Sequence, residues 1–174
     1  MNEKESSIAG IIIWGIITNE LSLILDLENK LFDNFGKTIK RSEVLAFDYT
    51  KYYEPEMGTN LKRCWLVTAN LKPLEQLADI KNFARNIESN FFDQQGKRRI
   101  NIDPGFLTLS NFVLATTKNY GHRIYLKDDI FAEVTLIFRN RSFQALDWTY
   151  PDYRNAITFF NEVRTYLYQT IKSI

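Results

Sequence analysis

Three side chains in the second half of the chain have the chemistry for proton transfer, namely Asp103, His122 and Glu133. An imidazole titrates near neutral pH, and a nearby carboxylate can orient it or exchange a proton with it. His122 is the single histidine of the sequence. We therefore take these three residues as the catalytic candidates of a predicted polar cleft.

The relation between His122 and Glu133 depends on the register of a predicted hairpin. If Lys127 pairs with Ile130 across a two-residue turn, Glu133 lies diagonally opposite His122 on the same face. A slip of one residue would instead place Glu133 opposite Arg123 as an ion pair. The first register predicts an acid–base pair and the second an electrostatic contact at the surface or at the rim of a site, and the sequence leaves both open.

The same side chains could instead serve as hard ligands for a divalent cation. His122 and Glu133, joined by Asp103 or Asp48, would suit Mg²⁺ or Mn²⁺. The sequence has no His-x-x-His, Cys-x-x-Cys or His-Glu-x-x-His spacing, so a structural zinc site is not expected. A magnesium cofactor therefore stays open, whereas structural zinc does not.

The glycines near the N-terminus do not form a phosphate-binding loop. Gly10 and Gly15 have the spacing of a P-loop, but Ile16 and Ile17 stand where lysine and serine or threonine are required. In that motif the lysine neutralises phosphates and the hydroxyl binds Mg²⁺. We therefore expect no P-loop nucleotide site.

The motif Asp103-Pro104-Gly105 follows a predicted strand. One interpretation places the Asp103 carboxylate at a strand end, beside exposed backbone N–H groups. The other is a turn in which Asp103 accepts local N–H bonds and Gly105 adopts a positive φ. The sequence favours the turn.

Basic and aromatic residues are expected to surround the same cleft. The predicted ligand-binding residues, which share charge or hydrogen-bonding capacity, are Asp48, Arg63, Arg98, Arg99, Thr117, Lys118, Arg123, Trp148 and Tyr150. Their positive charge suits an anionic small ligand, phosphorylated or a nucleotide. Whether the protein is an enzyme is left open, as is its oligomeric state.

A non-enzymatic RNA- or protein-binding module is the competing hypothesis, because local basic clusters lie near tyrosines that could stack on bases. The chain has 22 basic and 21 acidic residues, a net charge of +1, and so lacks the broad electrostatic footprint of nucleic-acid binding. The two hypotheses differ in geometry. An enzyme needs its catalytic candidates together in a concave site, whereas a binding module spreads basic residues and tyrosines over one open face.

Length and composition are those of an ordinary globular chain. With 174 residues, 45% apolar and 25% charged, we expect one domain over residues 1–174. The single cysteine, Cys64, excludes an intrachain disulfide. The apolar run Ile8–Ile17 is about half the length that crosses a bilayer, and the mixed-charge N-terminus is a poor signal peptide. We therefore expect a cytoplasmic protein with no membrane partner.

The hydrophobic pattern predicts an α+β fold with the order β-α-β-β-α-β, which is the ferredoxin-like, split βαβ pattern. This core would occupy about residues 8–103, and a β-hairpin and a C-terminal helix would follow in about 104–174. The predicted elements are strands at Ile8–Ile17, Thr38–Phe47, Leu61–Ala69, Arg98–Ile102 and Phe143–Trp148, a hairpin of Arg123–Leu126 with Ile130–Phe138, a loop at Asp48–Asn60, and helices at Leu21–Phe35, Leu74–Phe91, Leu109–Lys118 and from near Pro151 to Ile171.

Several segments together carry a resemblance to a known family. They are Phe47–Tyr53, Glu56–Gly58, Leu61–Arg63, Asn101–Gly105, Leu114–Lys118, His122–Leu126, Ala132–Leu136 and Trp148–Tyr153, and the match runs from about Ile8 to Arg164. They resemble a bacterial family of uncharacterised proteins, a domain of unknown function, some of whose members are labelled "GTP-binding protein".

The chain departs from that family's pattern at two positions. Asn119 stands where Asp is expected, and Phe106 stands where Tyr is expected. A guanine-reading segment of the Asn/Thr-Lys-x-Asp type needs its Asp to bind the N–H groups of the base. Thr117-Lys118-Asn119-Tyr120 lacks it, so this segment does not predict guanine recognition by that route.

Overall fold

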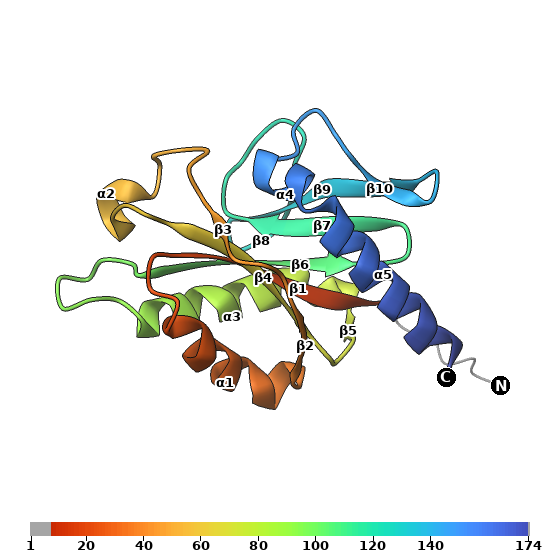
Figure 1. Cartoon of the computed structure of the whole chain (residues 1–174), viewed down its shortest axis with the longest axis horizontal. Coiled ribbons are helices and arrows are strands. Elements are labelled where there is room, and N and C mark those ends of the chain that lie inside the picture. The colour runs from red at the N-terminus through yellow and green to blue at the C-terminus, as the bar shows by residue number, and fades with distance from the viewer. Residues whose placement is uncertain (1–7, 174) are drawn as a thin grey trace.

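The computed structural model describes residues 8–173 and has a mixed α/β architecture. Ten strands of the described chain form one open antiparallel sheet, against which helices pack (Figure 1). The strand order is β10-β9-β7-β6-β1-β4-β2, with β3 also paired to β4, β5 to β1 and β8 to β9. The segment 1–7, on which the expectation about a signal peptide rested, lies outside the described residues.

The bounds of the elements show a sheet larger than the predicted four-stranded core. The strands are β1 (Ala9–Thr18), β2 (Thr38–Arg41), β3 (Leu45–Ala46), β4 (Lys62–Thr68), β5 (Lys72–Pro73), β6 (Ile100–Leu107), β7 (Asn111–Thr116), β8 (Ile124–Lys127), β9 (Ile130–Arg139) and β10 (Ser142–Ala145). The helices are α1 (Leu23–Phe35), α2 (Glu54–Met57), α3 (Leu77–Asn90), α4 (Pro151–Asn155) and α5 (Ile157–Lys172), and a 3-10 turn (Leu74–Gln76) precedes α3. The sheet is larger because β7, β9 and β10 continue it beyond β6.

The apolar run predicted as a buried strand forms β1 at the centre of the sheet. β4 pairs with one edge of β1 and β6 with the other. Alternate side chains point to opposite faces, so Trp14 and Ile16 join one hydrophobic cluster while Ile11 and Ile13 join another. Because both faces are covered, every residue from Gly10 to Thr18 is buried.

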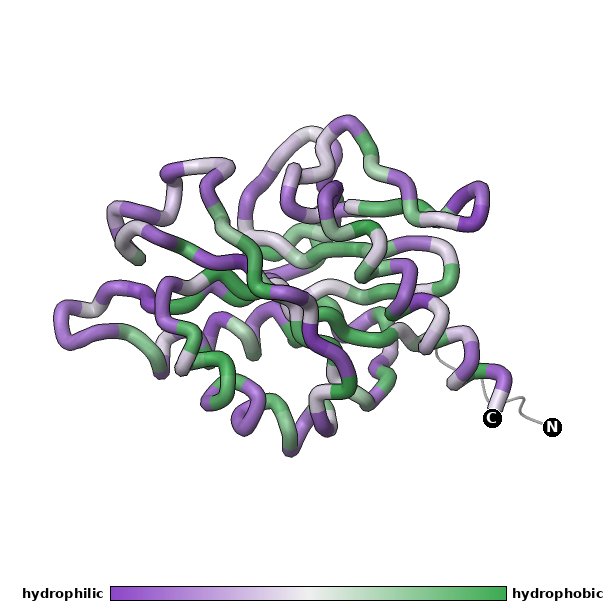
Figure 2. The backbone as a smooth tube through the Cα atoms, in the orientation of Figure 1, coloured by the Kyte–Doolittle hydropathy of each residue, from purple (hydrophilic) through white to green (hydrophobic). Residues whose placement is uncertain are grey.

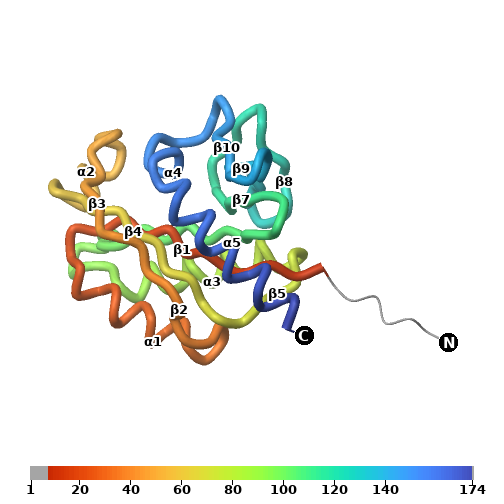
Figure 3. Tube along the Cα trace, turned by 45° about the vertical axis from the view of Figure 1, so that its right-hand side comes forward, coloured from red at the N-terminus to blue at the C-terminus, as the bar shows by residue number. Residues whose placement is uncertain are grey.

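Helices cover both faces of the sheet. α1 and α3 lie on one face and α4 and α5 on the other (Figures 1 and 3). Hydrophobic residues concentrate in the strands, and hydrophilic residues concentrate in the surrounding loops (Figure 2). No helix within residues 8–173 is both long enough and apolar enough to cross a bilayer.

The buried side of α1 differs from the prediction. The residues that face the core are Leu23, Leu27, Leu31 and Phe35, whereas Leu21, Leu25 and Phe32 are exposed. The helix begins two residues later than predicted. Two apolar stripes compete on this helix, and contact with the sheet selects the one whose members repeat every four residues.

Residues Asn111–Thr116 form β7, so the short helix predicted for Leu109–Lys118 is wrong. Phe112 lies opposite Leu107 of β6 and Leu136 of β9, which complete its burial from both sides. A short apolar segment can fit either periodicity, and here pairing with two neighbouring strands decides the outcome.

The Asp103-Pro104-Gly105 motif lies inside β6, so neither the strand-end nor the turn interpretation is correct. A Cβ atom on Gly105 would lie 2.4 Å from Cζ of Phe112 and 2.7 Å from the carbonyl oxygen of Val113. This glycine therefore permits close packing against β7, and it needs no positive φ for this role.

The remaining boundaries differ in smaller ways. The predicted strand Thr38–Phe47 is divided into β2 and β3, the predicted loop contains α2, and the last predicted helix is divided into α4 and α5 at Ala156. The predicted strand Phe143–Trp148 is shorter and forms β10. The predicted hairpin is confirmed, and its turn residues Asp128 and Asp129 have φ values of 53° and 58°.

Candidate functional site

The sheet opens between β6 and β7, and the candidate site lies beside this opening. β6 pairs with β1 from Ile100 to Leu107, but it pairs with β7 only from Gly105 to Leu107. Before Gly105 the two strands separate, while β7 stays paired to β9 as far as Thr116. The first half of β6 therefore has an edge without a neighbouring strand.

Pro104 explains where the pairing of β6 with β7 ends. In an antiparallel ladder, the N–H and C=O groups of one residue point to the same edge, and residues two apart share that edge. The N–H and C=O groups of Ile102 do not pair with β1 but bond to side chains of α3. Pro104 faces the same edge as Ile102 and has no N–H to donate, so it cannot continue a full ladder.

Two charged side chains of α3 take the place of the missing strand. Nζ of Lys81 donates to the carbonyl oxygen of Ile102 at 2.9 Å, and the N–H of Ile102 donates to Oε1 of Glu88 at 2.5 Å. Burial raises the pKa of Glu88, and this effect outweighs the attraction of Lys81. The backbone N–H and C=O groups of Ile102 at the unpaired edge of β6 therefore have hydrogen-bond partners, although no strand closes the opening.

A cavity of about 520 Å³ occupies this region, a size typical of small-molecule sites. Six parts of the chain line it: the segment before α2, β4, α3, β6 with the residues just before it, the end of β7 with the β7–β8 connection, and the start of α4. Five basic side chains (Arg63, Lys81, Arg85, Arg98 and Lys118) and three acidic ones (Glu88, Asp103 and Asp152) are among them.

Asp103 stands between donors at the floor of the cavity. Nζ of Lys81 donates to its Oδ1 at 2.8 Å, and Nδ2 of Asn101 donates to its Oδ2 at 2.6 Å. Burial alone would raise the pKa of Asp103, but Lys81 and Arg63 lower it below its usual range. The floor therefore holds an ionised carboxylate at neutral pH.

A buried ion pair lies beside Asp103. Nε of Arg63 donates to Oδ2 of Asp152 at 2.7 Å, and both side chains are almost fully buried. Space for the guanidinium comes from Gly15 of β1, since a Cβ atom there would lie 3.1 Å from Nη1 of Arg63 and 2.8 Å from the hydroxyl of Tyr153. Within the described chain, neither Nη1 of Arg63 nor the hydroxyl of Tyr153 has a hydrogen-bond partner.

Tyrosines and Lys118 form the outer wall. Nζ of Lys118 lies 3.8 Å from the ring centroid of Tyr52 and 5.7 Å from that of Tyr53, which are cation–π contacts. Burial lowers the pKa of Lys118, and attraction to Asp103 only partly opposes the shift. Burial also raises the pKa of Tyr53, so its hydroxyl stays protonated.

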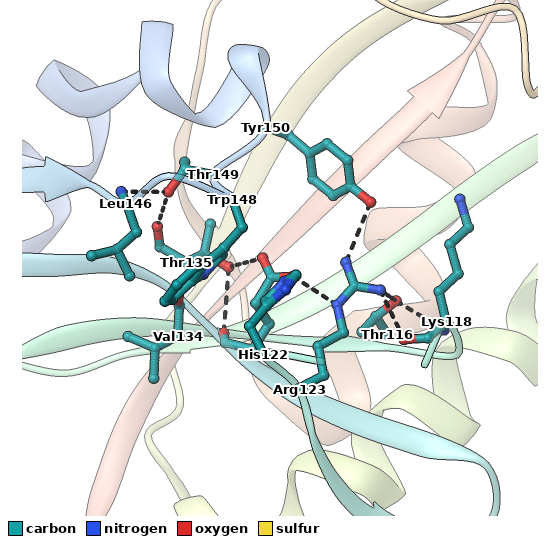
Figure 4. Close-up of polar contacts among 11 residues, drawn as sticks. Thr116, Lys118, His122, Arg123, Val134, Thr135, Leu146, Trp148, Thr149 and Tyr150 are labelled. Atoms are coloured by element: carbon teal, nitrogen blue, oxygen red, sulfur yellow. Dashed lines mark hydrogen bonds and ion pairs between the residues drawn. The ribbon is translucent and has the colours of Figure 1, made fainter. Parts of the chain in front are cut away.

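A second polar cluster adjoins the cavity and is centred on Glu133, whose side chain is 0% exposed. Nε of Arg123 donates to Oε2 of Glu133 at 2.7 Å, Nε2 of His122 lies 2.8 Å from the same oxygen, and Thr135 donates to Oε1 at 3.1 Å. The ring of His122 is stacked on that of Trp148, with centroids 4.8 Å apart. This cluster is shown in Figure 4.

Arg123 connects this cluster to the cavity. Its Nη1 donates to the carbonyl oxygen of Lys118 at 2.8 Å and its Nη2 to the hydroxyl of Tyr150 at 3.3 Å. Figure 4 shows Lys118 and Tyr150 on either side of this guanidinium. The Glu133–Arg123 pair thus holds two residues that line the cavity.

A bulge in the hairpin reconciles the two registers predicted for His122 and Glu133. Lys127 pairs with Ile130 as the first register requires, but the register then shifts by one residue before Tyr125. Because of this shift, Glu133 reaches both His122 and Arg123. The contacts expected from the two registers are therefore both present, and the Arg123–Glu133 pair is buried and does not lie at the surface.

The residues predicted from the sequence separate into three groups. Asp103, Arg63, Arg98, Thr117, Lys118 and Tyr150 line the cavity. His122, Glu133, Arg123 and Trp148 form the adjoining cluster. Asp48 and Arg99 belong to neither group, and Arg99 forms an ion pair with Glu20. The structure thus does not place Asp103 in one cluster with His122 and Glu133.

Lys81 and Glu88 line the cavity but were missed by the sequence analysis, although the sequence carried a signal for them. They are seven residues apart, and together with Leu77 and Ala84 they fall on the buried stripe of α3. Charged residues at core positions of an amphipathic helix require a polar partner, and this requirement points to a site. Asp152 and Tyr153 belong to the aromatic and polar stretch Trp148–Arg154, which the sequence also offers as a wall of the cleft, and both line the cavity.

No group of three or more His, Cys, Asp or Glu side chains in residues 8–173 is placed to hold a metal ion. His122 and Glu133 are in contact, but neither Asp48 nor Asp103 completes a ligand set with them. The carboxylates of Glu133 and Asp103 are instead paired with Arg123 and Lys81, respectively.

Cys64 of β4 is buried, and burial raises the pKa of its thiol to about 11. At pH 8 only about one thiol in a thousand would be ionised at such a pKa. We expect native protein to resist an aromatic disulfide reagent at pH 8 and to react with one equivalent in 6 M urea. Rapid labelling of the native protein would contradict this burial.

Comparison with known proteins identifies a family. A family model described as "Domain of unknown function (DUF4416)" matches residues 9–167. No curated protein and no solved structure matches the chain.

Proposed function

We propose a function for this chain, which belongs to DUF4416, a family described as a domain of unknown function. The proposal rests on the geometry of the site. The cavity between β6 and β7 binds an anionic small molecule. The observation that carries this proposal is that Lys118 and Arg85 line the cavity and form no ion pair within residues 8–173.

The charge distribution in the cavity supports an anionic ligand. Asp103 and Asp152 are already bound to Lys81 and Arg63, and Glu88 accepts the N–H of Ile102. Arg98 bonds to Glu56. What remains for a ligand is the positive charge of Lys118 and Arg85, which suits a phosphate or carboxylate group.

The shape of the site favours a small molecule over the competing RNA- or protein-binding module. The basic residues and tyrosines surround a cavity and are not spread over one open face. Tyr52, Tyr53 and Tyr150 offer ring surfaces beside the positive charge, which fits a phosphorylated compound or a nucleotide.

Replacing Lys118 tests this function. We expect Lys118→Ala to weaken binding of phosphorylated ligands about tenfold or more, because a charge-assisted contact is lost. Lys172→Ala is the matched control, since Lys172 also lies over a tyrosine ring, at 4.4 Å from the centroid of Tyr168, but does not line the cavity. The measurement is calorimetric titration with a panel that contains GTP with Mg²⁺, AMP, ribose 5-phosphate and pyrophosphate.

Two results would contradict the proposal. One is that no member of the panel binds to the folded protein. The other is that Lys118→Ala and Lys172→Ala have the same effect. Binding of a short single-stranded RNA in place of these ligands would support the competing module.

We also propose that the first half of the chain has the ferredoxin-like arrangement. The antiparallel order β6-β1-β4-β2, with α1 and α3 packed on one face, supports it. An experimental structure with a different strand order, or with these helices on opposite faces, would contradict it.

A further inference from the structure

We propose that the ligand of this cavity is a phosphorylated polyol, with its phosphate at Lys118 and Arg85 and a pair of neighbouring hydroxyl groups at Asp103. This inference rests on the proposed function and adds the chemical class of the ligand. Sugar phosphates and nucleoside monophosphates share this chemistry.

The cavity has two chemically different ends. Arg85 is exposed and Lys118 is half-buried, so the unpaired positive charge lies toward solvent. Asp103 lies deeper, between Lys81 and Asn101, both of which are buried. A ligand with its anionic group at the outer end therefore presents its other end to a carboxylate.

Asp103 has unused capacity to accept hydrogen bonds from such a ligand. The structure gives each of its oxygens one donor, Lys81 on Oδ1 and Asn101 on Oδ2, whereas an ionised carboxylate offers about four acceptor positions. Its side chain is 20% exposed and lines the cavity, so these positions face the ligand. An ionised carboxylate accepts only, and it selects a group that carries hydroxyl or amino hydrogens.

The donors around Asp103 hold the carboxylate in place for this role. Nζ of Lys81 is also bound to the carbonyl oxygen of Ile102, and the oxygen of Asn101 accepts from Nη1 of Arg98 at 2.9 Å. With the carboxylate fixed on both oxygens, two neighbouring hydroxyl groups can be recognised together. A second anionic group at this position would instead meet a like charge.

These features discriminate between different anionic ligands. A simple polyanion such as pyrophosphate satisfies the outer end but not Asp103. A compound with a phosphate and a vicinal diol satisfies both ends. A planar base adds contact with the tyrosine wall, so AMP is expected to bind more tightly than ribose 5-phosphate.

The first test compares ligands on the unmodified protein, so it does not depend on the folding of a variant. We expect AMP to bind about tenfold or more tightly than 2′,3′-dideoxy-AMP, which keeps the phosphate and base but lacks both hydroxyl groups. Equal affinities for these two compounds would overturn the inference.

The second test uses Asp103→Asn, whose effects on two ligands have opposite signs. We expect its affinity for AMP to fall about tenfold and its affinity for pyrophosphate to rise several-fold, because a hydrogen-bond acceptor and a like charge are both removed. Changes of the same sign for both ligands, in a variant that melts cooperatively, would overturn the inference.

The two proposals can fail separately. If Lys118→Ala leaves the binding of every ligand unchanged, the proposed function fails. If binding depends on Lys118 but the hydroxyl groups and Asp103 have no effect, only the polyol inference fails.

Discussion

Glu133→Ala is expected to lower the free energy of unfolding by about 3–5 kcal/mol, one of the largest effects in this protein. The side chain of Glu133 is 0% exposed and that of Arg123 is 1% exposed, and their ion pair measures 2.7 Å. Removing the carboxylate leaves a buried guanidinium without its counter-charge and removes the partner of His122 and Thr135. The cost of an unpaired buried charge therefore adds to the lost hydrogen bonds.

Urea denaturation followed by circular dichroism measures this effect. The matched control is Glu162→Ala, which removes the carboxylate of a 2.7 Å ion pair with Lys40 whose side chains are 35% and 54% exposed. A surface pair of this kind contributes less than about 1 kcal/mol. If the two variants were equally stable, the Glu133 cluster would not be the buried network described above.

Glu133 also helps to hold the cavity in shape through Arg123. Arg123, released from Glu133, would no longer be fixed against the carbonyl oxygen of Lys118 and the hydroxyl of Tyr150. Glu133→Gln keeps the size of the side chain and an acceptor oxygen for Arg123, so we expect it to be less destabilising than Glu133→Ala.

Phe160→Ala is expected to cost about 3–5 kcal/mol, because it opens a cavity under α5. Phe160 is 0% exposed, and its ring contacts those of Trp65, Phe112 and Tyr153 at centroid distances of 5.8, 4.9 and 5.9 Å. It joins α5 to β4 and β7 on the face that also carries Arg63 and Asp152. The neighbouring side chains are large aromatics that cannot collapse fully into the space left by the ring.

Thermal or urea unfolding of the variant measures this loss, with Phe32→Ala as the control. Phe32 is 58% exposed on α1, so its truncation removes little buried area. A loss below about 1 kcal/mol for Phe160→Ala would mean that α5 contributes little to the packing of the sheet.

The positions of most helices and strands followed from local patterns. The Ile-rich run of β1, the strand β4 and the hairpin turn at Asp128 and Asp129 were predictable because burial on two faces and a two-residue turn leave clear periodic signals. The helix expected at Leu109–Lys118 failed for the opposite reason, since six residues fit either period and only pairing with β6 and β9 decides between them.

The sequence by itself determined which residue types are present for chemistry, and it singled out six of the residues that line the cavity. Only the tertiary structure decided that Asp103 separates from His122 and Glu133, and that Lys81 and Glu88 of α3 reach Asp103 and the edge of β6. The physical reason is that the site arises where a ladder between two strands stops. That stop depends on Pro104 facing one edge and on which helix lies near it, and both are properties of long-range pairing.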